Sequence, residues 1–342
     1  MISTIEEIIE DAKRGKMFVL VDDESRENEG DLIIPAQFVT PESINFMAKY
    51  GRGLICMPIT QKQADKMNLS PMAKNNAAKY GTAFTISIGA RDGVTTGISA
   101  HDRAKTVQVA ISESASEGDV VSPGHMFPLI AKDGGVLVRA GHTEAAVDIS
   151  MLAGLHPSAV ICEVMNDDGT MARLPDLLKF AELHDLKVGT IKNLISYRNK
   201  RETVIKLIEK RHDGKFEIRT YRDIKTGLIH HAILCGEQNN NVRVQTFNPS
   251  DLLLNKQSIV EKLQQKYQNF ALILISKPNE IEDTSGDRIK EYGTGAAILL
   301  DLGLKEINLI TQAKGKHLVA LEGFGIKIMQ EILFSIDECN GE

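Results

Sequence analysis

Six carboxylates crowd into the ten residues 22–31, namely Asp22, Asp23, Glu24, Glu27, Glu29 and Asp31, and Arg26 is the one basic residue among them. Crowded carboxylates repel one another unless a cation or hydrogen bonds compensate their charge. Mg²⁺ suits such a loop because it binds one or two carboxylates, several waters and substrate oxygens. A solvated acidic turn explains the same composition equally well. The loop therefore leaves a divalent-metal site and a plain surface turn as alternatives.

A second polar segment, Arg139-Ala140-Gly141-His142-Thr143, precedes an apolar helical pattern. Free backbone N–H groups at a helix N-terminus favour anions, and a neighbouring arginine can clamp a phosphate with its planar fork. Thr143 can cap the helix or bond the same anion. His142 could bind a metal through one ring nitrogen while the other nitrogen is held by a hydrogen bond. A capped helix with a hydrogen-bonded histidine is the alternative.

Three more positions carry candidate chemistry. His125 lies in the sequence Ser122-Pro123-Gly124-His125, which is typical of a turn and could present an imidazole to a cleft. Glu163 interrupts the apolar residues 159–164, where a carboxyl group is suited to acid–base work. Residues 95–99 offer hydroxyl groups and backbone donors ahead of a helix. The competing interpretations are a solvated histidine, a buried paired glutamate and an ordinary N-cap turn.

The elements that position these residues can be predicted from apolar patterning. Strands are expected at residues 17–21, 32–34, 53–59, 84–88, 136–138 and 159–164, and helices at 41–50, 103–111, 143–153 and 174–184. A capping box at Ser3 and Glu6 is expected to begin the first helix. Helices and strands that mix without strict βαβ alternation predict an α+β or complex α/β fold with a mixed sheet.

A length of 342 residues favours two domains, which we place at residues 1–200 and 213–338. Residues 195–212 are rich in charge, with Ile and Val at helical spacing, and we interpret them as a connecting helix. In the smaller α/β domain that follows, strands are expected at 216–221, 230–235 and 271–275, and helices at 256–267 and 295–302.

Composition excludes several classes of protein. The formal net charge of −6 argues against a dedicated binder of nucleic acid or anionic membranes. No apolar run is long enough to span a bilayer, and the acidic beginning of the sequence is unlike a secretory signal. The four cysteines are far apart in the sequence, which favours free thiols in a reducing cytoplasm.

Together these motifs resemble the 3,4-dihydroxy-2-butanone 4-phosphate synthase family. The resemblance rests on residues 22–31, 95–103, 123–128, 139–145 and 162–173, in this order, and extends to about residue 200. It implies conversion of D-ribulose 5-phosphate, a sugar phosphate, into L-3,4-dihydroxy-2-butanone 4-phosphate and formate, with Mg²⁺ or Mn²⁺. A generic metal-dependent sugar-phosphate isomerase or aldolase, which would release no formate, is an alternative. The family also implies a homodimer with active sites near the subunit interface.

The resemblance also implies roles for individual residues. Glu27 and His142 are expected to hold the metal ions, and His125 and Glu163 match positions essential to catalysis. Cys56 is similar to a position near the substrate, although a buried free thiol is equally plausible. The positions expected to contact the substrate are Arg26, Glu27, Asp31, Arg139, Ala140, Gly141, His142, Thr143 and Glu163.

The second half resembles a GTP cyclohydrolase II domain at residues 221–230, 291–303 and 321–325. That family holds a catalytic Zn²⁺ with three cysteines, whereas residues 247–264, the corresponding region here, contain none. The family's loop rich in arginine and glycine is replaced by residues 275–280. We therefore expect this domain to be inactive. The alternatives are a bifunctional enzyme that also hydrolyses GTP and a nucleotide-sensing or nucleotide-binding module.

Overall fold

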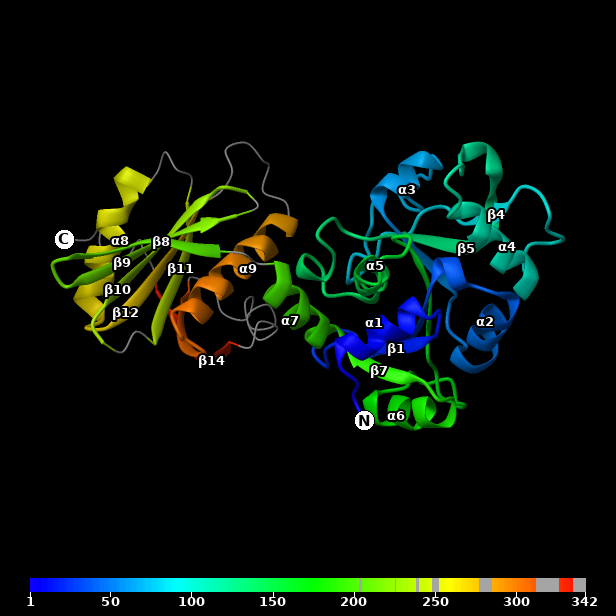
Figure 1. Cartoon of the computed structure of the whole chain (residues 1–342), viewed down its shortest axis with the longest axis horizontal. Helices are drawn as coiled ribbons and strands as arrows, with labels where there is room; N and C mark the ends of the chain where they lie inside the picture. Colours follow the sequence, from blue (N-terminus) through cyan, green and yellow to red (C-terminus); the bar gives the residue numbers. More distant parts are fainter. Residues whose placement is uncertain are drawn as a thin grey trace. The chain divides into compact units, whose positions relative to one another are not determined.

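The computed structural model describes residues 1–202, 205–224, 226–237, 240–247, 252–276, 285–311 and 326–334. The chain divides into two compact units, Met1–Leu194 and Ile195–Glu342 (Figure 1). The domain limits expected from sequence, 1–200 and 213–338, remain predictions. Within the described ranges, no helix combines the length and the apolar character that crossing a membrane requires.

The first unit is built on a seven-stranded sheet in the order β4-β5-β3-β6-β2-β1-β7. Strand β1 pairs antiparallel with β2 and parallel with β7, and β3 pairs parallel with β5 but antiparallel with β6. The predicted mixed sheet is therefore confirmed. The strands are β1 (Phe18–Val21), β2 (Gly30–Pro35), β3 (Cys56–Ile59), β4 (Ile88–Ala90), β5 (Val120–Ile130), β6 (Ala159–Glu163) and β7 (Lys187–Thr190).

Helices cover both faces of this sheet. Helix α5 contacts β2, β3, β6 and α1, and its residues from His142 to Ser150 are buried. Leu32 and Ile34 of β2 point to the opposite face, where they join a core with residues of α2, α4 and α6. The helices are α1 (Ile5–Lys13), α2 (Pro41–Phe46), α3 (Gln61–Lys66), α4 (Ala100–Ala110), α5 (His142–Leu152) and α6 (Leu174–Leu183).

Four local predictions for the first unit are wrong. Of the strand expected at residues 84–88, only residue 88 lies in a strand, β4. Residues 136–138 are not a strand: the chain makes a 3-10 turn at Gly135–Leu137, because Gly134 and Gly135 adopt positive φ and bend it. Residues 122–125, expected as a turn, lie within strand β5, in the irregular stretch between Val121 and Met126 where the pairing with β4 shifts its register. Helix α1 begins after Thr4, whose side chain accepts from the Glu7 N–H, so the capping box lies one residue later than expected.

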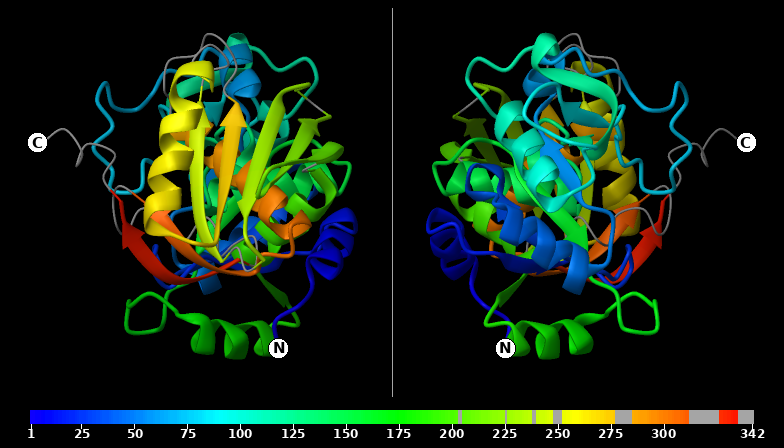
Figure 2. Two further views of the ribbon diagram at one scale, coloured as in Figure 1. Left: turned by 90° about the vertical axis from the view of Figure 1, so that its left-hand side faces the viewer. Right: turned by 90° about the vertical axis from the view of Figure 1, so that its right-hand side faces the viewer.

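The second unit contains another seven-stranded mixed sheet, in the order β14-β13-β11-β12-β10-β9-β8. Its strands are β8 (Ile205–Asp213), β9 (Phe216–Asp223), β10 (Ile229–Cys235), β11 (Asn241–Phe247), β12 (Phe270–Ser276), β13 (Glu306–Thr311) and β14 (Lys327–Leu333). Helix α8 (Leu252–Lys266) packs on one face through Ile259 and Leu263, and α9 (Ser285–Asp301) packs on the other through Ile298 and Leu299 (Figure 2).

The connecting helix predicted at residues 195–212 is correct only in its first part. Helix α7 (Ile191–Glu202) ends there, and residues 205–213 form edge strand β8 instead. Gly214, with a φ of 59°, provides the turn through which β8 pairs antiparallel with β9. This pairing overrides the helical spacing of the apolar residues, because strand preference depends strongly on tertiary partners.

Candidate active site

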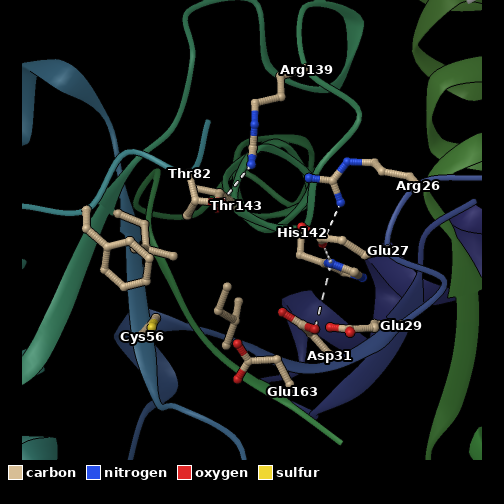
Figure 3. Close-up of a pocket in the computed structure, with 13 residues that line it drawn as sticks. Arg26, Glu27, Glu29, Asp31, Cys56, Thr82, Arg139, His142, Thr143 and Glu163 are labelled. Carbon is tan, nitrogen blue, oxygen red and sulfur yellow. Dashed lines mark hydrogen bonds and ion pairs between the residues drawn. The ribbon is translucent and has the colours of Figure 1, made fainter. Parts of the chain in front are cut away.

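A pocket of about 520 Å³, including its open mouth, lies on the α5 face of the first sheet (Figure 3). It is found where β2 and β3 begin and β6 ends, next to the first residues of α5. Its lining residues are Arg26, Glu27, Glu29, Asp31, Cys56, Thr82, Phe84, Leu129, Arg139, His142, Thr143, Ile161 and Glu163.

The acidic loop between β1 and β2 is organised around the buried side chain of Asp22. Its Oδ2 accepts from Arg26 Nη1 at 2.8 Å and from the Glu27 N–H at 3.1 Å, and its Oδ1 accepts from the Glu29 N–H at 2.8 Å. Arg26 Nη1 also lies 2.6 Å from Glu27 Oε2. The loop is therefore preformed, with much of the repulsion between its carboxylates offset by these contacts.

His142 is the first residue of α5 and is buried beneath this loop. Its Nε2 lies 3.2 Å from the carbonyl oxygen of Leu20, which can only accept, so Nε2 carries a proton. Its Nδ1 faces two carboxylates, at 3.8 Å from Glu27 Oε2 and 3.7 Å from Asp31 Oδ1. A hydrogen bond on one ring nitrogen that orients the other is typical of metal-binding histidines.

The charges in this cluster are strongly coupled. Burial raises the pKa of Asp31 to about 7, and nearby carboxylates add to the effect. Burial also raises the pKa of Glu27, but His142 and Arg26 outweigh it and lower that pKa to about 2. Burial lowers the pKa of His142, but Asp31 and Glu27 outweigh it and raise that pKa to about 9. The cluster thus stabilises a positive charge between its carboxylates.

These side chains fit a hard divalent cation. Asp22, Glu27 and His142 offer ligand atoms that all lie within 4.8 Å of one another. However, both oxygens of Asp22 already accept hydrogen bonds within the loop. Asp31 Oδ1 is buried without a hydrogen-bond partner and lies 3.7 Å from His142 Nδ1, so a second carboxylate faces the same histidine. Carboxylate oxygens with one imidazole suit Mg²⁺ or Mn²⁺.

Arg139 forms the other side of the pocket and is fixed by three partners. Nη1 donates to Glu144 Oε2 at 2.6 Å, Nε to the Tyr80 carbonyl oxygen at 3.1 Å, and Nη2 to Thr82 Oγ1 at 3.0 Å. Gly141, the N-cap of α5, makes no side-chain cap. The first N–H groups of α5 are therefore open to an anion beside Arg139. Thr143 is the second residue of the helix and does not cap it.

Glu163 ends strand β6, directly opposite Asp31 of β2 in the sheet register. Its Oε2 accepts a hydrogen bond from the Leu54 N–H at 2.8 Å. Cys56 is a buried free thiol at the start of β3, and burial raises its pKa above the usual range. A protonated thiol is a poor nucleophile, so Cys56 contributes to the shape of the pocket.

Not every residue singled out in the sequence reaches the pocket. Eight do: Arg26, Glu27, Asp31, Cys56, Arg139, His142, Thr143 and Glu163. Ala140 and Gly141 are not among the lining residues. His125 is exposed and lies on β5 outside the pocket, against Gly97 of the loop that precedes α4.

Sequence reasoning missed the segment that carries Tyr80 and Thr82. Thr82 lines the pocket, and the Tyr80 ring lies 5.1 Å from the Arg26 guanidinium carbon. Residues 70–87 contain little regular structure, so no helical or strand periodicity indicated their importance. Their positions follow from contacts with Arg26 and Arg139, which are distant in sequence.

Residues 6–197 match the family model of 3,4-dihydroxy-2-butanone 4-phosphate synthase. The chain belongs to this family. A relative from Photobacterium phosphoreum named 3,4-dihydroxy-2-butanone 4-phosphate synthase is 44% identical, with 97% of this chain and 99% of the relative covered. Riboflavin biosynthesis protein RibBA from Aquifex aeolicus is 42% identical over 98% of this chain and 93% of its own length. The chain is accordingly an enzyme, a lyase of riboflavin biosynthesis with 3,4-dihydroxy-2-butanone 4-phosphate synthase activity.

Residues 252–333 match the family model of GTP cyclohydrolase II, so the second unit is a cyclohydrolase II-like domain. The two-unit arrangement is also that of RibBX from A. baumannii, described as a two domain 3,4-dihydroxy-2-butanone 4-phosphate synthase. Its crystal structure has a TM-score of 0.68 and 40% identity, covering 97% of this chain and all of that one. Another synthase, solved in complex with two magnesium ions, is 41% identical with a TM-score of 0.56, covering 58% of this chain and 98% of its own.

Proposed function

We propose that the pocket of the first unit converts D-ribulose 5-phosphate into L-3,4-dihydroxy-2-butanone 4-phosphate and formate with Mg²⁺ or Mn²⁺. The observation that carries the proposal is the convergence of Glu27 and His142, whose ligand atoms lie within 4.8 Å of each other and of Asp22, next to the buried carboxylate of Asp31. A bound divalent ion would stabilise negative charge that develops on substrate oxygens. The related synthase with two magnesium ions supports this choice of cofactor.

The remaining pocket residues suit binding and proton transfer. Arg139, Thr143 and the N-terminus of α5 form the side where the substrate phosphate would bind. Arg26, tied to Asp22 and Glu27, would contact the substrate beside the acidic loop. Glu163 faces the same space and would transfer protons, because its strand partner Asp31 and the Leu54 N–H fix its position.

We further infer a homodimer, because His125 is exposed and outside the pocket of its own chain. If His125 acts in catalysis, as its family position implies, it must act in the pocket of a second copy. Such a shared site is a normal use of two-fold symmetry. A cytoplasmic location is also part of the proposal, supported by the buried free thiols of Cys56, Cys162 and Cys235.

For the second unit we propose no cyclohydrolase activity. Residues 247–264 contain no cysteine, and in the described part of the chain the one metal-competent cluster is that of the first unit. The two-domain synthase RibBX is named for the synthase activity alone, which supports this view. The segments at 277–280 and 321–325 lie outside the described residues. A bifunctional enzyme or a nucleotide-binding module are the alternatives.

The synthase proposal is tested by measuring formate released from D-ribulose 5-phosphate with Mg²⁺. We expect the native protein to release formate and Glu27→Gln and His142→Ala to lose at least about 100-fold in kcat/KM, because ligands of an essential metal act in every turnover. Glu24→Gln is the matched control, an exposed acid of the same loop that does not line the pocket. Formate release that persists in both pocket variants would refute the assigned metal site.

The second unit is tested by the zinc content of the purified protein and by incubation with GTP. We expect neither stoichiometric zinc nor GTP hydrolysis, because thiolate ligands are absent from residues 247–264. A rise in melting temperature on addition of GTP without turnover would instead favour the nucleotide-binding module, since a ligand of the folded state stabilises it.

A further inference from the structure

Three consecutive carbonyl groups of the acidic loop are bound by side chains that are distant in sequence. The Tyr80 hydroxyl donates to the carbonyl oxygen of Arg26. Arg173 Nη1 donates to the carbonyl oxygens of both Glu27, at 2.8 Å, and Asn28. These contacts differ from those of Asp22, which bind N–H groups within the loop and so tie the loop only to itself.

Arg173 is well placed to hold the acidic loop against the rest of the domain. It precedes α6, whose residue Leu177 is fully buried in the core beneath the sheet. Its backbone N–H donates to Asp176 Oδ2 at 3.1 Å, which anchors the residue at the helix start independently of its side chain. The side chain is half-buried and does not line the pocket, so it acts on the loop and not on a ligand in the pocket.

We propose that Arg173 is a positioning residue for the metal site. By holding the backbone at Glu27 and Asn28, it fixes the Glu27 carboxylate within reach of His142 Nδ1, 3.8 Å away in this structure. A charged donor also gives stronger hydrogen bonds to carbonyl oxygens than a neutral one. The inference rests on the proposed function in one respect, namely that Glu27 binds the metal.

An arginine suits this position better than other residues. One Nη1 carries two hydrogens and can serve both carbonyl oxygens at once. Asn28 has a φ of 54°, a left-handed conformation that changes the direction of the chain directly after Glu27. Two bonds across this unusual residue hold the loop in the conformation that carries Glu27 into the pocket. Loss of the guanidinium would leave the internal bonds of the loop intact but release its attachment to α6.

The test measures Mn²⁺ affinity by electron paramagnetic resonance in the full-length protein, without substrate. We expect Arg173→Met, which keeps the length and apolar stem, to weaken Mn²⁺ binding by about 10- to 100-fold, the range for partners that orient metal ligands. Arg173→Lys retains a cationic donor and should recover part of the loss. Added guanidinium ion should restore affinity to Arg173→Met, which a general structural defect would not show.

The matched control is Arg52→Met. Arg52 Nη1 also donates to a backbone carbonyl oxygen, that of Met165, at 3.0 Å, but Arg52 lies outside the pocket lining. Its substitution should leave Mn²⁺ affinity unchanged. In steady-state assays, Arg173→Met should raise the Mg²⁺ concentration needed for half-maximal activity, and most of the turnover should return at saturating Mg²⁺.

The Glu27→Gln variant distinguishes a wrong assignment of the metal site from a wrong assignment of the positioning role. If Glu27→Gln leaves Mn²⁺ affinity unchanged, the metal site itself is misassigned. If Glu27→Gln weakens binding but Arg173→Met and Arg173→Lys both bind Mn²⁺ like the native protein, the positioning role is overturned while the proposed function stands. A turnover defect in Arg173→Met that persists at saturating Mg²⁺ with native affinity would likewise overturn it.

Discussion

Gly141 shows how a residue can serve the pocket without lining it. A Cβ atom at this position would lie 2.4 Å from Arg139 Nη1 and 3.0 Å from Glu144 Oε2. Glycine is therefore required so that the Arg139 guanidinium can cross the start of α5 and reach Glu144, which is buried. The substrate contact expected at Gly141 from the family resemblance remains a prediction, and the space for this ion pair is a second reason for glycine there.

This interpretation predicts the effect of Gly141→Ala. The methyl group should displace the Arg139 guanidinium and raise KM for D-ribulose 5-phosphate by about 10- to 100-fold, the equivalent of about 1.5–3 kcal/mol for a hydrogen bond to a charged group. Steady-state kinetics of the variant check this. Gly118→Ala serves as control, because the nearest atom to a Cβ there is Ser116 Oγ at 3.7 Å. An unchanged KM in Gly141→Ala would contradict the steric argument.

At the scale of elements, the loop before α4 depends on one carboxylate. Asp102 accepts from the Thr95 N–H at 3.0 Å, from Thr95 Oγ1 at 2.7 Å and from the Gly97 N–H at 2.9 Å, while Ser99 caps the helix. Gly97 in turn packs against the His125 ring, since a Cβ there would lie 2.9 Å from Nδ1. Asp102 thus fixes the backbone on which His125 rests.

The same bonds, led by that from the Thr95 hydroxyl, lower the pKa of Asp102 to about 2. A depressed folded-state pKa stabilises the protein above the unfolded-state value, near 4, and this stabilisation is lost as the pH falls towards 2. Asp102→Asn should therefore lower the melting temperature by a few degrees at pH 7. The difference in melting temperature between the variant and the native protein should become smaller below about pH 4. Thermal unfolding at several pH values measures this.

Asp167→Asn is the control for that series, since its side chain is 94% exposed and its ion pair with Arg52 lies at the surface, where such pairs contribute little. It should unfold like the native protein across the range. A gap for Asp102→Asn that is as wide at pH 3 as at pH 7 would show that the carboxylate charge is not what stabilises the loop.

The elements differ in how well their sequences predicted them. Strands β1 and β6 were predicted correctly. Both faces of a central strand are covered, so its residues form a continuous apolar run that is visible in the sequence. Strand β8 was misread as helix because all but one of its residues are exposed and its strand form depends on pairing with β9, which its own residue pattern does not reveal. Strand β5 was not predicted at all, because Ser122 and Pro123 interrupt it with the pattern of a turn.

Most residues named from the sequence for the site do line one pocket. The residue types in the acidic loop and at the start of α5 are themselves typical of metal and phosphate binding. Glu27, Asp31 and His142 could therefore be named before their distances were known. Contacts between distant segments could not be predicted in this way. The bonds from Arg173 and Tyr80 to the acidic loop depend on how the chain folds back on itself.

For the whole molecule, a shared active site predicts complementation between two inactive variants. His125→Ala and Glu27→Gln homodimers should each be nearly inactive, because each lacks one group in both pockets. Random mixing of the two chains by co-expression should restore about a quarter of native activity, since half the dimers carry one intact pocket of two. Formate release by the co-purified mixture measures the gain, and activity no greater than that of the separate variants would argue against a shared site.

The register between β2 and β6 sets limits on how the family can vary in length. Asp31 faces Glu163 and Leu32 faces Cys162, so each strand turns its one acid to the pocket and the neighbouring residue to the core. Because side chains in a strand point alternately to opposite faces, one inserted or deleted residue would turn Asp31 into the core and Leu32 into the pocket. We expect insertions and deletions to be rare in β2 and β6 of related sequences. The exposed tip at residues 167–169 can gain or lose residues without moving either acid.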